Sequence, residues 1–230
     1  MVSVRWVDSA ESTNTILRDG PCEHGDSVAT FNQTNGRGRL GREWIDVPGK
    51  GLAISVAVCV PVAVPTLVPL VAGAAAIESI RALTGRTDLW LKWPNDVYLG
   101  DSKVAGILTE MPSAGRIIVG LGLNINHRTD ELPVSTATSL AIEGIEIDPV
   151  AFAEGWSELL CLRSAEIGSN ALTAWINGFI GLKGELVRID FPDGTHRTGT
   201  LAGIAADGSL VLGTGDPIVA GDISRLRPAE

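Results

Sequence analysis

The sequence predicts an α/β fold in which a mixed β-sheet with helices precedes a small all-β unit. Short β-branched segments alternate with segments of helical spacing over most of the chain, which is typical of a sheet covered by helices. The pattern changes at residues 178–184, and beyond them two Asp-Gly pairs separate short alternating segments. Such pairs are hairpin signals. We therefore expect one domain over residues 1–180 and a small β-barrel domain over residues 181–230.

Hydrophobic spacing gives the order of the elements in the first domain. An apolar segment at residues 2–7 precedes a helical pattern after Ser12. Helices are also expected from about residue 65 and at residues 149–167 and 170–179, where apolar residues recur at helical spacing. Strands are expected at residues 27–31, 52–60, 88–93, 97–99, 104–109 and 117–125.

Every residue between Lys50 and Glu78 is uncharged, and this stretch is long enough to cross a membrane. Pro61, Pro65 and Pro69 interrupt it, however, and each proline removes a backbone donor. The pattern therefore favours a buried strand, a turn and a buried helix over a transmembrane helix.

The composition is that of a folded globular protein. Of the 230 residues, 45% are hydrophobic and 20% are charged, which excludes a disordered or fibrous chain and allows a core without disulfides. The formal net charge is −9, whereas binding to nucleic-acid phosphates needs a basic face. We therefore expect no nucleic-acid partner.

The cysteines and histidines predict neither a disulfide framework nor a zinc site. Cys22, Cys59 and Cys161 are odd in number, widely spaced and without a CxxC pair, which fits a reducing cytoplasm. The histidines lack HExxH spacing, and no Ser/His/Asp or GxSxG arrangement occurs. Residues 1–14 lack a basic region followed by an apolar stretch, so we expect no signal peptide.

The stretch QTNGRGRLGREW at residues 33–44 is the most informative part of the sequence. Its glycines match the GxGxxG fingerprint of dinucleotide sites, and a strand is expected before it. Asp46, Pro48 and Gly49 follow, however, so no helix N-terminus is available for a pyrophosphate. A nicotinamide-dependent oxidoreductase is therefore disfavoured.

The same stretch carries Arg37, Arg39 and Arg42 in an otherwise acidic chain. Guanidinium groups suit phosphate and carboxylate oxygens, and glycines let the backbone close over a bulky anion. A site for an anion is one interpretation, and a solvated basic loop is the other.

A second stretch, LKWPNDVYL at residues 91–99, places Trp-Pro-Asn-Asp between two expected strands. This is an ordinary turn sequence, because Pro fixes φ and because Asn and Asp bond their own backbone. Lys92 and Lys103 lie at the start of the neighbouring strands that flank it. Their ammonium groups can approach one anion, and a pair of surface lysines is the alternative.

Two further segments have a structural and a functional interpretation. Ser12, Thr13 and Asn14 stand at the head of the first expected helix, where each can act as a cap. The glycine-spaced strand GLGLNIN at residues 120–126 permits the close approach of a ligand or of another backbone, and a bulge is the alternative.

In this order, STN at residues 12–14, GRGRLGREW at 36–44, KWPNDV at 92–97, KVAGIL at 103–108 and GLGLNIN at 120–126 resemble the biotin protein ligase family. The resemblance implies a catalytic domain related to class II aminoacyl-tRNA synthetases and a C-terminal SH3-like β-barrel. It also implies two half-reactions. Biotin and ATP with Mg²⁺ give biotinyl-5'-AMP and pyrophosphate, and a lysine of a biotin carboxyl carrier domain then takes the biotinyl group.

The resemblance assigns roles to residues at the matching positions. The catalytic residues would be Lys103, Arg39 and Asp96. The biotin-binding residues would be Ser12, Thr13, Asn14, Gln33, Arg37, Gly38, Arg39 and Lys103. The residues near ATP or the adenylate would be Arg37, Arg39, Arg42, Trp44, Lys92, Asn95 and Asn124, the last of these near the metal or phosphates.

The STN motif begins at residue 12, which leaves no room for the N-terminal winged helix of some family members. We therefore expect a monofunctional cytoplasmic ligase that acts on a carboxylase carrier domain, without a nucleic-acid or membrane role, as a monomer or a homodimer. The alternatives are a lipoate or octanoate ligase, which the GRGR and KWPND motifs disfavour, and a biotin-binding module without turnover.

Overall fold

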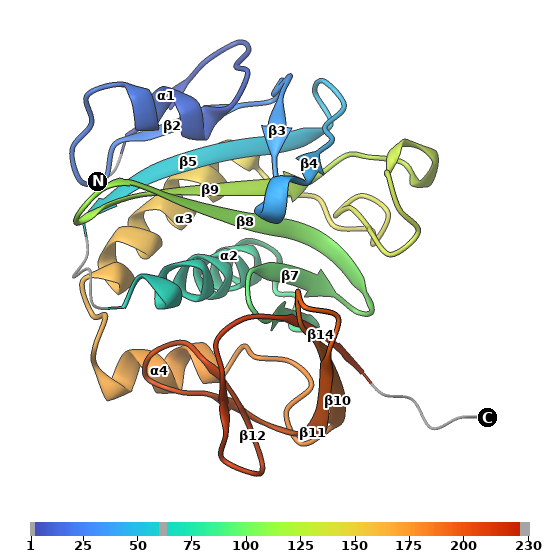
Figure 1. Ribbon diagram of the computed structural model, residues 1–230. Coiled ribbons are helices and arrows are strands. Elements are labelled where there is room, and N and C mark those ends of the chain that lie inside the picture. The colour runs from blue at the N-terminus through green and yellow to red at the C-terminus, as the bar shows by residue number, and fades with distance from the viewer. Residues whose placement is uncertain (1–2, 60–63, 226–230) are drawn as a thin grey trace.

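The computed structural model describes residues 3–59 and 64–225, and it has a mixed α/β architecture (Figure 1). Within these residues a seven-stranded sheet has the order β1-β2-β5-β9-β8-β7-β6, and a five-stranded sheet follows at the C-terminal end. The pair β1 and β2 is parallel, and the other neighbours in the large sheet are antiparallel. The prediction of a mixed sheet is therefore confirmed.

The strands of the large sheet lie close to the expected segments. Residues 2 and 60, which belong to two of those segments, lie outside the described residues. The long central strands have almost no exposed side chain, as their continuous apolar sequences predict. The seven strands are β1 Val4–Trp6, β2 Ser27–Thr30, β5 Gly51–Cys59, β6 Leu89–Lys92, β7 Asp96–Leu99, β8 Ser102–Ser113 and β9 Arg116–Asn124.

Helices cover both faces of the large sheet (Figure 1). Helix α1, Thr13–Asp19, lies against β2, β5 and β9 on one face. Helices α2, Val68–Thr84, and α3, Pro149–Ser164, cover the other face, and α4, Asn170–Asn177, continues toward the C-terminal sheet. Local sequence sets their ends: Asp148 caps α3 through two backbone N–H groups, and Gly85 ends α2 with a left-handed φ of 71°.

The segment Pro65–Thr84, a 3-10 turn continued by α2, is long and apolar enough to cross a membrane by length and composition. Its most apolar window is 67% buried inside the structure. Residues on several sides of α2 contact the sheet and α3. Helix α2 is therefore buried in the way expected of a helix in a protein core.

The two faces of strand β9 differ in side-chain size, and this difference creates room for a site. Ile117, Val119, Leu121 and Leu123 belong to the main core, on the side of α2 and α3. Burying each of these side chains contributes about 1.5–3 kcal/mol. Ile118 points to the opposite face, where it joins a small cluster with α1. Because side chains alternate along a strand, the next positions on that face are two glycines and then Asn124.

The C-terminal sheet has the order β13-β12-β11-β10-β14. The predicted Asp-Gly hairpins join β10 to β11 and β11 to β12, and Gly194 and Gly208 have φ values of 82° and 80°. Nε1 of Trp93 donates to the Gly208 carbonyl at 3.0 Å, which fastens this sheet to the large one. The strands are β10 Leu186–Asp190, β11 His196–Ile204, β12 Leu210–Leu212, β13 Pro217–Ile218 and β14 Asp222–Arg225.

The Arg/Gly stretch forms a small hairpin that the sequence analysis did not anticipate. Strand β3, Gly36–Arg37, pairs with β4, Glu43–Trp44, and a 3-10 turn at Arg39–Gly41 connects them. Leu40 in this turn has a φ of 57° and a largely exposed side chain. The hairpin stands over the α1 face of the sheet (Figure 1).

Candidate active site

A cavity of about 490 Å³ lies on the α1 face of the large sheet. Helix α1 borders it, the β3–β4 hairpin covers it, and residues 190–192 and 220–222 of the C-terminal region complete its wall. Its volume is in the range of about 300–1,000 Å³ that is usual for small-molecule sites. The site thus lies where three parts of the chain converge.

Glycines make the floor of this cavity. A Cβ at Gly122 would lie 2.7 Å from Nε1 and from Cζ2 of Trp44, and one at Gly106 would lie 3.1 Å from the same ring. A Cβ at Gly120 would lie 3.0 Å from Cγ of Asn14 and closer still to its Oδ1. The β5–β9 register runs without a shift through these positions. Close approach of side chains, rather than a bulge, therefore explains the glycine spacing.

One end of the cavity is polar and largely closed to solvent. The Thr13 N–H donates to Oε1 of Gln33 at 3.0 Å, and Oγ of Ser55 lies 2.7 Å from Oγ1 of Thr13 and 2.6 Å from Oδ1 of Asn14. Ser12 occupies the N-cap position of α1, but its side chain makes no capping hydrogen bond. The hydroxyl of Ser12 therefore remains available to a ligand.

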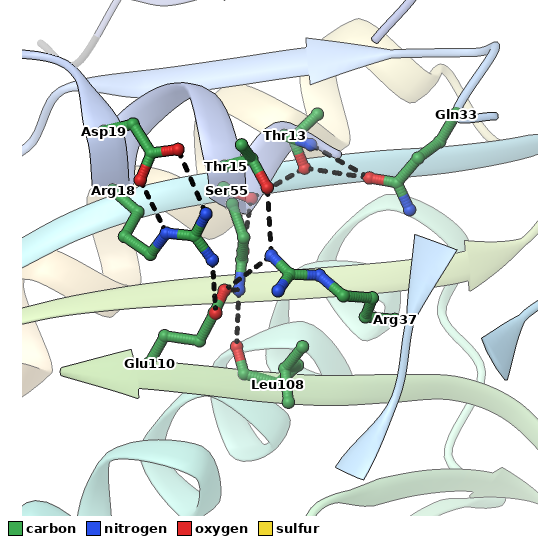
Figure 2. A network of polar contacts seen from close by, with 10 residues as sticks. Thr13, Thr15, Arg18, Asp19, Gln33, Arg37, Ser55, Leu108 and Glu110 are labelled. Atoms are coloured by element: carbon green, nitrogen blue, oxygen red, sulfur yellow. Dashed lines mark hydrogen bonds and ion pairs between the residues drawn. The ribbon is translucent and has the colours of Figure 1, made fainter. Parts of the chain in front are cut away.

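Charged side chains surround this polar end (Figure 2). Glu110 accepts from Nδ2 of Asn14 at 2.8 Å and from Nη1 of Arg18 at 3.2 Å. Nη2 of Arg37 donates to Oγ1 of Thr15 at 2.9 Å and lies 3.5 Å from Glu110. The guanidinium of Arg37 thus joins the β3–β4 hairpin to α1 and β8.

The other end of the cavity is cationic. Nζ of Lys103 forms an ion pair with Asp96 at 2.7 Å and lies 5.6 Å from the ring centre of Trp44. Nη1 of Arg39 donates to Oδ1 of Asn95 at 2.9 Å, and Nδ2 of Asn95 donates to the carbonyl of Ile107 at 2.9 Å. Asn95 therefore connects the β6–β7 turn and β8 to the arginine hairpin.

Arg42 also lines the cavity. In residues 3–59 and 64–225, its guanidinium has no hydrogen bond and no acidic partner. An incoming phosphate can therefore pair with it without first displacing a carboxylate.

Lys92 lies beside the cationic end and is held by the C-terminal sheet. Its Nζ is 3.2 Å from Asp222 and 3.5 Å from the hydroxyl of Tyr98. Burial alone lowers the pKa of Lys92, but the charges of Tyr98 and Asp222 and the hydrogen bonds to both outweigh it, so the pKa lies above its ordinary value. The side chain therefore stays protonated at neutral pH.

The comparisons with known proteins agree with this geometry. The sequence matches the biotin/lipoate A/B protein ligase family over residues 6–124. The chain belongs to this family. It is 31% identical over 229 residues to the bifunctional ligase/repressor BirA of Bacillus spizizenii, covering 92% of this chain and 69% of that protein. It is 32% identical over 210 residues to the biotin--[acetyl-CoA-carboxylase] ligase of Mycobacterium tuberculosis, covering 85% and 77%.

A solved structure of the same family has the same fold along the whole chain. The biotin protein ligase of Aquifex aeolicus in complex with biotin and ATP is 29% identical, with a TM-score of 0.81, covering 99% of this chain and 100% of that chain. The motifs that suggested a biotin protein ligase therefore identified the family correctly.

Most of the residues that the family resemblance suggested meet at one cavity. Its walls include twelve of them, from four separate segments of the sequence: Ser12, Thr13, Asn14, Gln33, Arg37, Gly38, Arg39, Arg42, Trp44, Asn95, Asp96 and Lys103. The Arg/Gly stretch therefore faces a cavity and is not simply a solvated loop.

Two of the suggested residues do not line the cavity. Lys92 ends β6, whereas we expected it to begin a strand, and it faces Asp222 while Lys103 faces Asp96. In this structure the two ammonium groups therefore pair with different carboxylates. Asn124 is buried, and its Nδ2 donates to the carbonyl of Thr138 at 3.0 Å, which fastens the loop after β9.

Three residues that shape the site were not predicted from the sequence. Glu110 ends the apolar part of β8, Ser55 interrupts an otherwise apolar strand, and Asp222 follows a glycine at the start of β14. Polar residues within apolar strands are a usable signal, because burial of a polar group without a partner is costly. Asp222 carried no such signal, since only the folding of the C-terminal sheet brings it to Lys92.

Among the described residues, no group of three or more His, Cys, Asp or Glu side chains is arranged to hold a metal ion. Of the carboxylates at the cavity, Asp96 and Asp222 are paired with Lys103 and Lys92, and Glu43 and Asp190 also line it. What the cavity offers is hydrogen-bonding groups at one end and positive charge at the other.

Proposed function

We propose that this protein is a biotin protein ligase, which forms biotinyl-5'-AMP from biotin and ATP and transfers the biotinyl group to a lysine of a biotin carboxyl carrier domain. The observation that carries the proposal is the polarity of the cavity beneath the β3–β4 hairpin. Closed hydrogen-bonding groups at one end suit an uncharged polar ring, and cations at the other suit a carboxylate and phosphates.

The polar end complements a cyclic urea. The carbonyl oxygen of Gln33 is taken by the Thr13 N–H, so Nε2 of Gln33 remains to donate to the ligand's carbonyl. Oδ1 of Asn14 lies over Gly120 and has a second lone pair, which can accept from a ligand N–H. Biotin offers both partners.

The same end argues against lipoate. The dithiolane ring of lipoate has neither N–H nor C=O groups, so it would leave Nε2 of Gln33 and the second lone pair of Asn14 Oδ1 without a partner. Leaving such a group unsatisfied costs about 1–3 kcal/mol. The free energy of binding at the polar end therefore favours biotin over lipoate by the cost of these unsatisfied groups.

In the first step, an oxygen of the biotin carboxylate bonds to the α-phosphorus of ATP, and the bond from that phosphorus to the bridging oxygen breaks. Pyrophosphate leaves with the electron pair. Both reactants are anions, so the barrier contains a large repulsion that fixed cations reduce. Lys103 would lie between carboxylate and α-phosphate, and Arg39 and Arg42 would neutralise the departing phosphates. Trp44 would cover the nucleotide.

In the second step, the neutral amine of the acceptor lysine bonds to the biotinyl carbonyl carbon, and AMP leaves. A free lysine amine has a pKa of about 10.4, so it must lose a proton on entering the site. Asp96, ion-paired to Lys103 at 2.7 Å, would orient the amine and take that proton. Closure of the β3–β4 hairpin would keep water from the mixed anhydride.

The proposal extends to the metal, the two domains, the acceptor and the oligomeric state. Mg²⁺ enters as MgATP, residues 1–180 form a catalytic domain related to class II aminoacyl-tRNA synthetases, and residues 181–230 form an SH3-like barrel. The acceptor is the carrier domain of a carboxylase in the cytoplasm. Neither nucleic acid nor a membrane is a partner, and the enzyme is a monomer or homodimer.

Transfer to an acceptor tests the proposal. The purified protein is incubated with MgATP, biotin or lipoate, and either a biotin carboxyl carrier domain or a lipoyl domain, and each acceptor is analysed by mass spectrometry. We expect a single biotinyl adduct on the target lysine of the carrier domain and none on the lipoyl domain. Lipoylation without biotinylation would overturn the assignment.

A further inference from the structure

The carboxylate of Glu110 contacts three side chains from two elements, α1 and β3, at the closed end of the cavity. It accepts from Asn14 and Arg18 of α1, at 2.8 and 3.2 Å, and lies 3.5 Å from Nη2 of Arg37 in β3. Figure 2 shows it between Arg18 and Arg37, below α1. Glu110 itself does not line the cavity. Any effect it has on a ligand must therefore pass through these neighbours.

The hydrogen bonds around Asn14 fix which way its amide points. Nδ2 faces two acceptors, Glu110 at 2.8 Å and the Leu108 carbonyl at 3.4 Å, while Oδ1 receives the hydroxyl of Ser55 at 2.6 Å. Rotating the amide would place Nδ2 against the Ser55 hydroxyl and Oδ1 against a carboxylate. Since a carboxylate cannot donate, Glu110 makes the observed orientation the favoured one.

This orientation determines what Asn14 presents to the cavity. Oδ1 lies over Gly120 on the cavity floor and retains a lone pair after accepting from Ser55. The cavity therefore offers a hydrogen-bond acceptor at this point. A rotated amide would offer donors, which a ligand N–H group cannot use.

We propose that Glu110 is a positioning residue: it orients the Asn14 amide so that the amide oxygen accepts a ureido N–H of biotin. This inference rests on the proposed function. Glu110 does not touch the ligand, and its contribution is to the affinity for biotin rather than for ATP.

The test measures biotin binding by isothermal titration calorimetry and the KM for biotin and for ATP in biotin-dependent pyrophosphate release. In Glu110→Gln, the amide NH2 group, which is itself a donor, must face a donor group of Asn14, Arg18 or Arg37. We expect biotin to bind at least tenfold more weakly, with the KM for ATP within threefold of wild type. Asp19→Asn is the matched control. It removes the exposed partner of Arg18, and we expect it to leave both constants unchanged.

A reciprocal exchange separates positioning from a merely structural role. Asn14→Asp alone sets two carboxylates against each other and weakens biotin binding. In Asn14→Asp with Glu110→Gln, the new Gln donates to the new Asp, so an oxygen again faces the cavity and the total charge is conserved. We expect the double variant to bind biotin at least tenfold more tightly than Asn14→Asp alone.

Three outcomes decide the matter. If wild type binds no biotin, the proposed function fails. If wild type binds and Glu110→Gln binds equally well, the positioning role is wrong while the function stands. If the double variant binds biotin no more tightly than Asn14→Asp alone, Glu110 does not act through the Asn14 amide. Should Glu110→Gln fold poorly by thermal unfolding, Glu110→Asp, which retains the charge at a shorter reach, must show the same selective loss of biotin affinity.

Discussion

Alanine substitutions at two glycines of β9, only two residues apart, are expected to damage different halves of the reaction. Gly120→Ala places a Cβ 3.0 Å from Cγ of Asn14, and Gly122→Ala places one 2.7 Å from Nε1 and Cζ2 of Trp44. Ordinary contacts between such atoms are about 3.5–4.0 Å. Each neighbour must therefore retreat by about 0.5–1 Å, and a misplacement of about 1 Å can cost about 10²-fold in rate.

The size of each effect follows from what the neighbour loses. Asn14 is 4% exposed and bonded on both sides, so it cannot yield without breaking hydrogen bonds worth about 1 kcal/mol each. The Trp44 side chain is held by fewer hydrogen bonds, but moving it away from Lys103 loses a cation–π contact that contributes about 1–2 kcal/mol. We expect Gly120→Ala to raise the KM for biotin and Gly122→Ala the KM for ATP, each by about tenfold, since about 1.4 kcal/mol is a factor of ten.

Initial rates of pyrophosphate release, with one substrate varied and the other saturating, measure both constants. Gly155→Ala is the control, because Gly155 is exposed on α3 and a Cβ there would have no neighbour within 4 Å. That variant should gain about 0.5–1 kcal/mol in the free energy of unfolding and change neither KM. If Gly120→Ala and Gly122→Ala raised both constants alike, the division of the cavity into two ends would be refuted.

Three other predictions concern stability and reactivity. His127→Ala should lower the free energy of unfolding by about 2–5 kcal/mol in chemical denaturation, because it leaves a cavity where the buried imidazole packs 3.4 Å from the Asp46 carboxylate; an unchanged midpoint would contradict this. Trp93→Phe should lower the free energy of unfolding by about 1–3 kcal/mol, because the Gly208 carbonyl loses its buried donor. An unchanged free energy of unfolding would show that this hydrogen bond does not hold the C-terminal sheet against the large sheet. Burial raises the pKa of Cys161 to about 11, so alkylation of the native thiol, followed by mass spectrometry, should be negligible at pH 8 and rise only as the pH approaches 11; rapid labelling at pH 8 would refute it.

Residue patterns predicted the strands and hairpins correctly where the local sequence preference agrees with the tertiary fold. The apolar run of β5 and the Asp-Gly pairs of the C-terminal hairpins are each stabilised by their own residues, and their positions followed from pattern alone. The strand at residues 120–126 was ambiguous. Glycine is required at these positions because Asn14 and Trp44, which are distant in sequence, pack directly over them in the folded protein.

The parts of the site that escaped prediction depend on tertiary pairing. Strands β3 and β4 have two residues each, too few for any periodicity to be seen. Asn95 and Asp96 suggested a local turn, yet their side chains contact β8 and Lys103 rather than their own backbone. Lys92 meets Asp222 across two sheets. No local pattern encodes such a contact, because its partners are about 130 residues apart in a chain whose order along the sheet differs from its order in sequence.

The most direct test of the account is a reaction without an acceptor. The protein is mixed with biotin and MgATP, pyrophosphate is measured, and the bound product is identified by mass spectrometry, with lipoate and a Lys103→Ala variant in parallel. The account predicts a biotin-dependent burst of pyrophosphate, stoichiometric with the protein, retained biotinyl-5'-AMP, and no burst with lipoate or with the variant. Biotin binding without adenylate would contradict it and indicate a binding module, and a burst with lipoate alone would show that the polar end of the cavity serves another ligand.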